Sequence, residues 1–162
     1  SRRVEDWIMP YRILCKTRVP MWMRGQVESL LFFNGGQHRL RDAIADSIER
    51  YGVPEVVEDA TGLHIAVSGI AEAHTLWAVH EEGTLARAVG VLVYARDAAD
   101  RMTVLHVGVA ADYAQGGAYA SEHVLARLMQ QARRIARDTA GVRHLGIAYH
   151  HSRLRLSAAL SA

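Results

Sequence analysis

The segment with the clearest chemical potential is a glycine-bearing loop between a strand pattern and a long helical pattern. Gly116 and Gly117 separate the apolar alternation of residues 102–109 from an amphipathic stretch that runs from 118 to 138. A loop that opens a helix presents free backbone N–H groups and the positive end of the helix dipole, which together bind anions such as phosphate. The same glycines also suit a strand-to-helix turn that binds nothing. The loop therefore predicts either a phosphate site or a structural turn.

Two regular elements must position this loop. The residues before it alternate between two faces, as a strand does: Thr103, Leu105, Val107 and Val109 on one face, with Val104, His106 and Gly108 on the other. From Ala118 onward, apolar residues recur at steps of three and four, which predicts an amphipathic helix of about five turns. Gly141, just past Arg137 and Asp138, is expected to end it.

The rest of the chain is punctuated by glycine, proline and turn-forming residues. These patterns predict strands at Tyr11–Val19, Leu63–Val67, Thr75–His80, Leu85–Ala95 and Arg143–Tyr149, and helices at Trp22–Phe33 and Arg39–Tyr51. Thr75 to Val109 is typical of an antiparallel meander. Because a crossover helix precedes it, the strand at 143–149 is expected to lie parallel to the strand at 102–109.

This order predicts the α/β class, with a mixed and mostly antiparallel central sheet flanked by helices. We expect a single domain over residues 1–162, with residues 1–10 as a loose N-terminal extension. The tail that follows residue 149 is compatible with a short helix or an edge strand. An exposed sheet edge at that end would favour a homodimer.

Composition excludes several classes of function. The chain has 162 residues, 22% of them charged, and a net charge of only +2, which is not the footprint of a nucleic-acid-binding protein. No apolar run is long enough to span a membrane and no signal peptide is visible, so we expect a cytoplasmic protein. The one cysteine, Cys15, lies in an apolar run and is predicted to be a buried, inert thiol. The adjacent His150 and His151 would point to opposite faces of a strand, so no metal site is expected.

The segment from Val104 to Ala120 resembles the GNAT superfamily, the general N-acyltransferases that use acetyl-CoA. Leu105-His-Val107-Gly-Val109 fits the strand end of that family, Ala111-Asp112-Tyr113 fits the turn that follows, and Gly117 fits the first glycine of its loop. Element order extends the resemblance to Tyr11–Tyr149. The resemblance implies an acetyl-CoA-dependent N-acetyltransferase, in which a small-molecule or peptide amine attacks the thioester directly.

The same resemblance assigns the cofactor contacts. The backbone of Val107, Gly108 and Val109 would bond the pantetheine arm of acetyl-CoA. The diphosphate would be held by the N–H groups of Gln115, Gly116, Gly117, Ala118, Tyr119 and Ala120. No metal is expected.

Acyl transfer also needs a general base near the thioester. His106 is the best candidate, because it is the lone titratable group in an apolar strand and histidine titrates near neutrality. The alternative is a core histidine bonded to a backbone carbonyl. Tyr149 could supply the acid, or could simply pack at the strand end. His80 and Glu82 are weaker candidates for the base and are expected to be solvated.

Two departures from the family pattern favour a second hypothesis. With Gly117 as the first family glycine, the final Gly/Ala position is Tyr119, and no tyrosine follows Tyr149. A catalytically degraded GNAT fold that binds acyl-CoA or a protein partner without turnover is therefore the main alternative. A third possibility is an unrelated α+β binding module, in which the Gly-Gly turn is only structural.

Overall fold

The computed structural model describes residues 10–32, 48–148 and 158–159. The elements, in order, are β1 (Tyr11–Lys16), a 3₁₀ helix (Met21–Met23), α1 (Arg24–Phe32), β2 (Pro54–Asp59), β3 (Gly62–Val67), β4 (His74–Glu82), β5 (Leu85–Ala98), β6 (Arg101–Val109), two further 3₁₀ helices (Ala111–Tyr113 and Ala120–Glu122), α3 (Val124–Asp138), β7 (His144–Ile147) and β8 (Ala158–Ala159). None of the helices within these ranges has the length and apolar character needed to cross a membrane.

The main sheet confirms the predicted α/β class. Its strands lie in the order β1-β4-β5-β6-β7-β8, and β2 and β3 form a separate two-stranded sheet. Neighbours in the main sheet are antiparallel except β6 and β7, which are parallel as the crossover helix between them requires. The meander formed by β4, β5 and β6 is confirmed. Its first turn falls at Gly83, whose φ of 58° suits glycine, so Glu81 and Glu82 belong to β4 and not to the turn.

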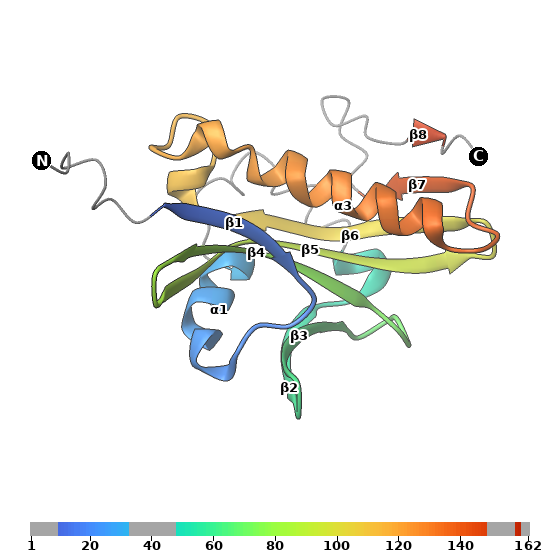
Figure 1. The fold of residues 1–162 in the computed structure, drawn as a ribbon. Coiled ribbons are helices and arrows are strands. Elements are labelled where there is room, and N and C mark those ends of the chain that lie inside the picture. The colour runs from blue at the N-terminus through green and yellow to red at the C-terminus, as the bar shows by residue number, and fades with distance from the viewer. Residues whose placement is uncertain (1–9, 33–47, 149–157, 160–162) are drawn as a thin grey trace, which may run out of the picture.

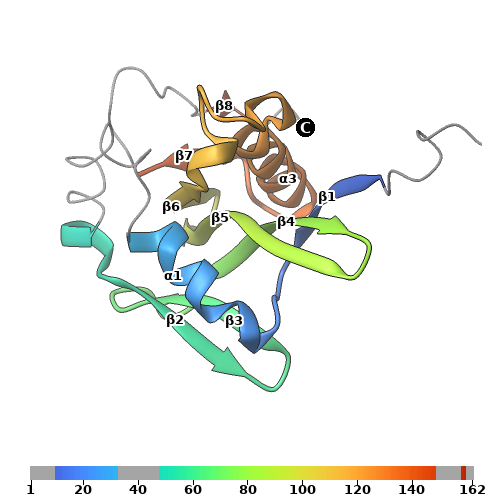
Figure 2. The ribbon, with the colours of Figure 1, turned by 90° about the vertical axis from the view of Figure 1, so that its left-hand side faces the viewer.

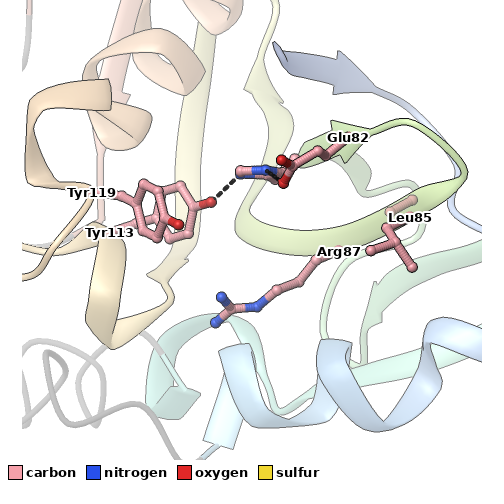
Figure 3. Close-up of a pocket in the computed structure, with 7 residues that line it drawn as sticks. Glu82, Leu85, Arg87, Tyr113 and Tyr119 are labelled. Carbon is pink, nitrogen blue, oxygen red and sulfur yellow. Dashed lines mark hydrogen bonds and ion pairs between the residues drawn. The ribbon is translucent and has the colours of Figure 1, made fainter. Parts of the chain in front are cut away.

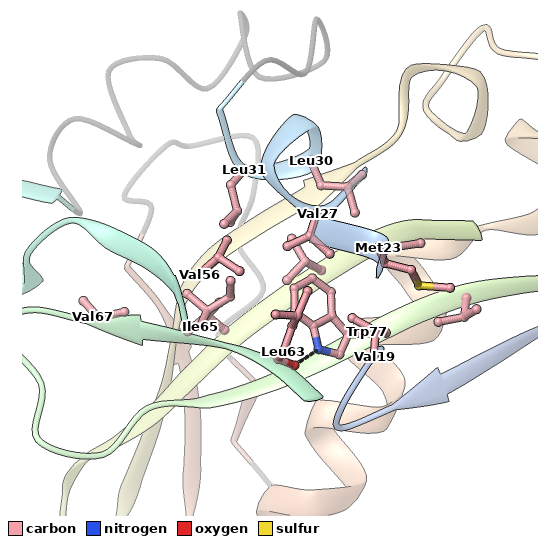
Figure 4. Close-up of a cluster of buried hydrophobic side chains, with 14 of the residues drawn as sticks. Val19, Met23, Val27, Leu30, Leu31, Val56, Leu63, Ile65, Val67 and Trp77 are labelled. Atoms are coloured by element: carbon pink, nitrogen blue, oxygen red, sulfur yellow. Dashed lines mark hydrogen bonds between the residues drawn. The ribbon is translucent and has the colours of Figure 1, made fainter. Parts of the chain in front are cut away.

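Helices and a hairpin cover the two faces of this sheet. Helix α3 lies along one face, and α1 lies with the β2–β3 hairpin on the other (Figures 1 and 2). The core on the α1 side is centred on Trp77, which is fully buried and donates its indole N–H to the Leu63 carbonyl at 3.2 Å (Figure 4). The two apolar clusters therefore share one sheet, and each face carries its own set of side chains.

Helix α3 is shorter at its start than the sequence pattern predicts. It begins at Val124, because residues 118–123 form turns and a 3₁₀ helix and His123 adopts a left-handed conformation with φ 52°. Its apolar stripe packs on the sheet, and its end at Asp138, followed by Gly141 with φ 83°, agrees with the prediction.

The structure also bears on the two helices predicted in the N-terminal part of the chain and on Cys15. The helix expected at Trp22–Phe33 is present, as the first 3₁₀ helix followed by α1. Most of the helix expected at Arg39–Tyr51 lies outside the described residues, although 48–51 are helical and Gly52 follows with φ 104°. Cys15 is exposed, so the prediction of a buried thiol is wrong: β1 is the edge strand of the sheet, and the described residues shield its sulfur only in part.

Candidate functional site

The glycine loop is folded onto itself. The N–H of Gly117 donates to the Ala114 carbonyl at 2.9 Å, that of Tyr119 to Asp112 at 2.7 Å, and that of Ala120 to Gly117 at 3.2 Å. These three of the six amides that were predicted to hold a diphosphate are already bonded within the chain. A common cradle formed by all six is therefore wrong for this structure.

Both glycines of the loop have structural reasons to be glycine. Gly116 has a φ of 85°, which other residues rarely adopt, and a Cβ on Gly117 would lie 2.5 Å from the Asp112 carbonyl oxygen. The loop is also separated from the first turn of α3 by the 3₁₀ helix Ala120–Glu122. The alternative of a structural turn therefore accounts for the Gly-Gly pair.

A β-bulge in β6 decides where His106 points. The register pairs Val93 with His106 but Tyr94 with Val104, which leaves Leu105 as an extra residue. Leu105 joins the core on the α1 side, and His106 lies on that side as well because its partner Val93 does. The expectation that His106 faces away from Leu105 is therefore wrong, whereas Val107 does face the opposite cluster.

His106 is buried and uncharged. It is only 3% exposed, and burial lowers its pKa to about 4, against the opposing effect of a hydrogen bond to the backbone of Leu31 in α1. The expectation that it titrates near neutrality is wrong for this reason. Its Nε2 is buried and has no hydrogen-bond partner among the described residues. The ring nitrogen that bonds to Leu31 thus fits the core-histidine interpretation. The other, Nε2, is an acceptor that no described residue uses.

The strand residues after His106 lie between α1 and α3. A Cβ on Gly108 would come within 2.4 Å of the Leu30 carbonyl oxygen, so β6 and α1 touch through their backbones. The pairing of β6 with β7 joins Arg101–Val104 to His144–Ile147, and β6 then continues to Val109. Contact of Val107, Gly108 and Val109 with a pantetheine arm stays a prediction. Tyr149 lies outside the described residues.

A second group of side chains meets on the other face of the sheet. The ring of Tyr11 stacks on His80, with centroids 4.5 Å apart, and Tyr113 stacks on Tyr119 at 4.9 Å. The Tyr113 hydroxyl hydrogen-bonds to His80 Nδ1. We call these four residues the tyrosine–histidine cluster. The prediction that His80 is solvated is wrong, since its side chain is 12% exposed.

Charged groups surround this cluster. Arg87 makes a two-pronged ion pair with Asp112, at 2.6 and 2.9 Å, and its guanidinium lies 5.7 Å from the centre of the Tyr113 ring. The hydrogen bonds from Arg87 lower the pKa of Asp112, and burial raises the pKa of Tyr113 to about 12. At neutral pH the aspartate is therefore charged, and the Tyr113 phenol is protonated.

A pocket opens between the cluster and the β4–β5 hairpin. Its volume is about 200 Å³, and it is lined by His80, Glu82, Leu85, Ala86, Arg87, Tyr113 and Tyr119. Figure 3 shows the two tyrosine rings across from Glu82, with Arg87 reaching in from β5. The sequence did not predict the cluster or its pocket, because the residues that form them come from β1, β4, β5 and the loop after β6. The available signal was the meander itself, which brings the hairpin tip and the end of β6 to the same end of the sheet.

Comparison of the chain with protein-family models, with curated proteins and with solved structures finds no match. Within the residues that the structure describes, no three His, Cys, Asp or Glu side chains are grouped as metal ligands. A function must therefore be argued from the two groups of side chains themselves.

Proposed function

We propose that the chain is an acetyl-CoA-dependent N-acetyltransferase, in which an amine attacks the thioester directly beside β6. The observation that carries the proposal is His106: a buried, uncharged imidazole at a strand bulge, whose Nε2 has no hydrogen-bond partner in the described part of the chain. A buried polar atom without a partner costs stability, so its retention favours a use in binding or chemistry. The mixed sheet with its crossover helix also agrees with the fold that the resemblance implies.

The reaction would need a general base, a binding surface for the pantetheine arm and a proton donor from the chain. The amine nitrogen bonds to the thioester carbonyl carbon, the C–S bond breaks, and a proton moves from nitrogen to the departing thiolate. His106 Nε2 would accept a hydrogen bond from the attacking amine and then its proton. The backbone of residues 107–109 would hold the pantetheine arm. Tyr149 remains the expected proton donor to the thiolate.

The bonded loop favours a second candidate. With the amides of Gly117, Tyr119 and Ala120 already engaged, the diphosphate would have fewer donors than the resemblance implies. Weak cofactor binding follows from that loss. A GNAT-like protein that binds acyl-CoA or a protein partner without turnover would carry the same loop.

Calorimetry with CoA and acetyl-CoA tests both candidates together, and thiol release across a panel of amines separates them. We expect binding of both ligands, and thiol release that His106→Gln abolishes while CoA affinity is kept. Binding without thiol release would leave only the second candidate. No binding at millimolar ligand would refute the acetyltransferase and an acyl-CoA-binding role, and would leave only the protein-partner form of the second candidate. Unchanged turnover in His106→Gln would remove His106 from the mechanism.

A further inference from the structure

We propose that the pocket between the tyrosine–histidine cluster and the β4–β5 hairpin binds a small organic ammonium ion. This site is separate from His106. Tyr113 belongs to the cluster of buried residues under α3, whereas His106 bonds to α1 on the other face of the sheet. The inference does not depend on the proposed acyl transfer.

The charges around the pocket leave one carboxylate for a ligand. Arg87 is neutralised by its two-pronged pair with Asp112, and Arg127 pairs with Glu122 at 3.2 Å. Glu82 is different: its one ion-pair partner in the described part of the chain is His80, whose Nε2 lies 3.5 Å away. A cation entering the pocket would therefore meet a carboxylate that no arginine or lysine already satisfies.

The aromatic rings favour the same charge. Tyr113 already makes a cation–π contact with the Arg87 guanidinium, which lies 5.7 Å from the centre of its ring. Tyr119 stacks on Tyr113 and stays 37% exposed, so part of this aromatic pair is open to a ligand. Cations lie favourably over tyrosine rings, and methylated ammonium ions gain most because little water must be removed from them. An anion would meet the rings and Glu82 unfavourably, and Arg87, which also lines the pocket, is already paired with Asp112.

The size and walls of the pocket limit the ligand. A volume of about 200 Å³ admits a small head group and not a folded segment of protein. Leu85 and Ala86 form an apolar wall for methyl groups or a short alkyl chain. Because β4 and β5 pair up to the hairpin turn, the wall that the hairpin supplies is held before a ligand arrives.

Choline and its uncharged analogue of the same shape, 3,3-dimethylbutan-1-ol, make a direct test on the full chain. We expect choline to cause saturable shifts in the amide and ring NMR signals of pocket residues, with an affinity about tenfold above that of the alcohol. Glu82→Gln should weaken choline by about two- to fivefold. Tyr119→Leu should weaken it as well. The matched control is Glu81→Gln, because Glu81 pairs with Arg12 and Lys16 and does not line the pocket.

Several outcomes would overturn the proposal. Equal affinity for choline and the alcohol would make the pocket merely apolar. Choline binding that neither Glu82→Gln nor Tyr119→Leu weakens would place the ligand elsewhere. Saturable shifts of the pocket signals with acetate or phosphate, and none with choline, would make Arg87 an anion site. The spectra of each variant also report whether it is folded, so loss of binding is distinguishable from loss of structure.

Discussion

Burial of His106 makes the free energy of unfolding depend on pH, in the range between the folded and the ordinary pKa of this side chain. In the folded chain its pKa is about 4, whereas the ordinary value is 6.5. The unfolded state therefore binds the proton more readily between these two values, so the contribution of His106 to stability is full above about pH 6.5 and falls as the pH drops toward about 4. The difference corresponds to about 3 kcal/mol of unfolding free energy.

Urea denaturation of the wild type and of His106→Gln at a series of pH values from 8 to 4 would measure this effect. The variant lacks the titrating ring but keeps an amide of similar size that can bond to the backbone of Leu31. We expect the wild type to lose about 3 kcal/mol more than His106→Gln over that range. His74→Gln is the control, because the His74 side chain is 46% exposed and its replacement should leave the wild-type slope in place. Parallel pH profiles for the wild type and His106→Gln would refute the argument.

Two further predictions concern packing. Gly108→Ala should destabilise the fold by about 1–3 kcal/mol, since its Cβ would come within 2.4 Å of a backbone oxygen of α1, and Gly25→Ala, with no atom within 4 Å of the added carbon, should be neutral or stabilising in the same urea titration. Trp77→Phe should cost about 2 kcal/mol, because it leaves the Leu63 carbonyl without its donor and opens a cavity; an unchanged thermal midpoint would contradict this.

The local periodicity of apolar residues predicted most of the fold. The alternation before Val109 and the three- and four-residue steps after Val124 predicted β6 and α3, and the crossover rule predicted that β7 is parallel to β6. The bulge at Leu105 could not be seen in this way, since it is a property of the pairing between β5 and β6 and leaves the alternation of β6 in the sequence unchanged.

The candidate site was less predictable, for two reasons. The start of α3 was placed too early because residues 118–123 contain good helix formers, whereas the hydrogen bond from Tyr119 N–H to the Asp112 carbonyl holds them in a loop. The tyrosine–histidine cluster was missed because Tyr11 and Tyr119 stand far apart along the chain. They meet only once β1 has paired with β4 and the loop has folded over both.

Cys15, exposed on the edge strand β1, gives the molecule a built-in attachment point. It is the sole cysteine in the sequence, so a maleimide dye would label one position without any engineering. Although the residue is exposed, partial shielding of the sulfur raises the pKa of the thiol, so coupling would be faster at mildly alkaline pH. Ile13, two residues before Cys15 on the same strand, pairs with His80 on β4. A dye on Cys15 would therefore lie near the His80 ring, which hydrogen-bonds to Tyr113. Fluorescence from this single label could then follow events at that end of the sheet in the native chain.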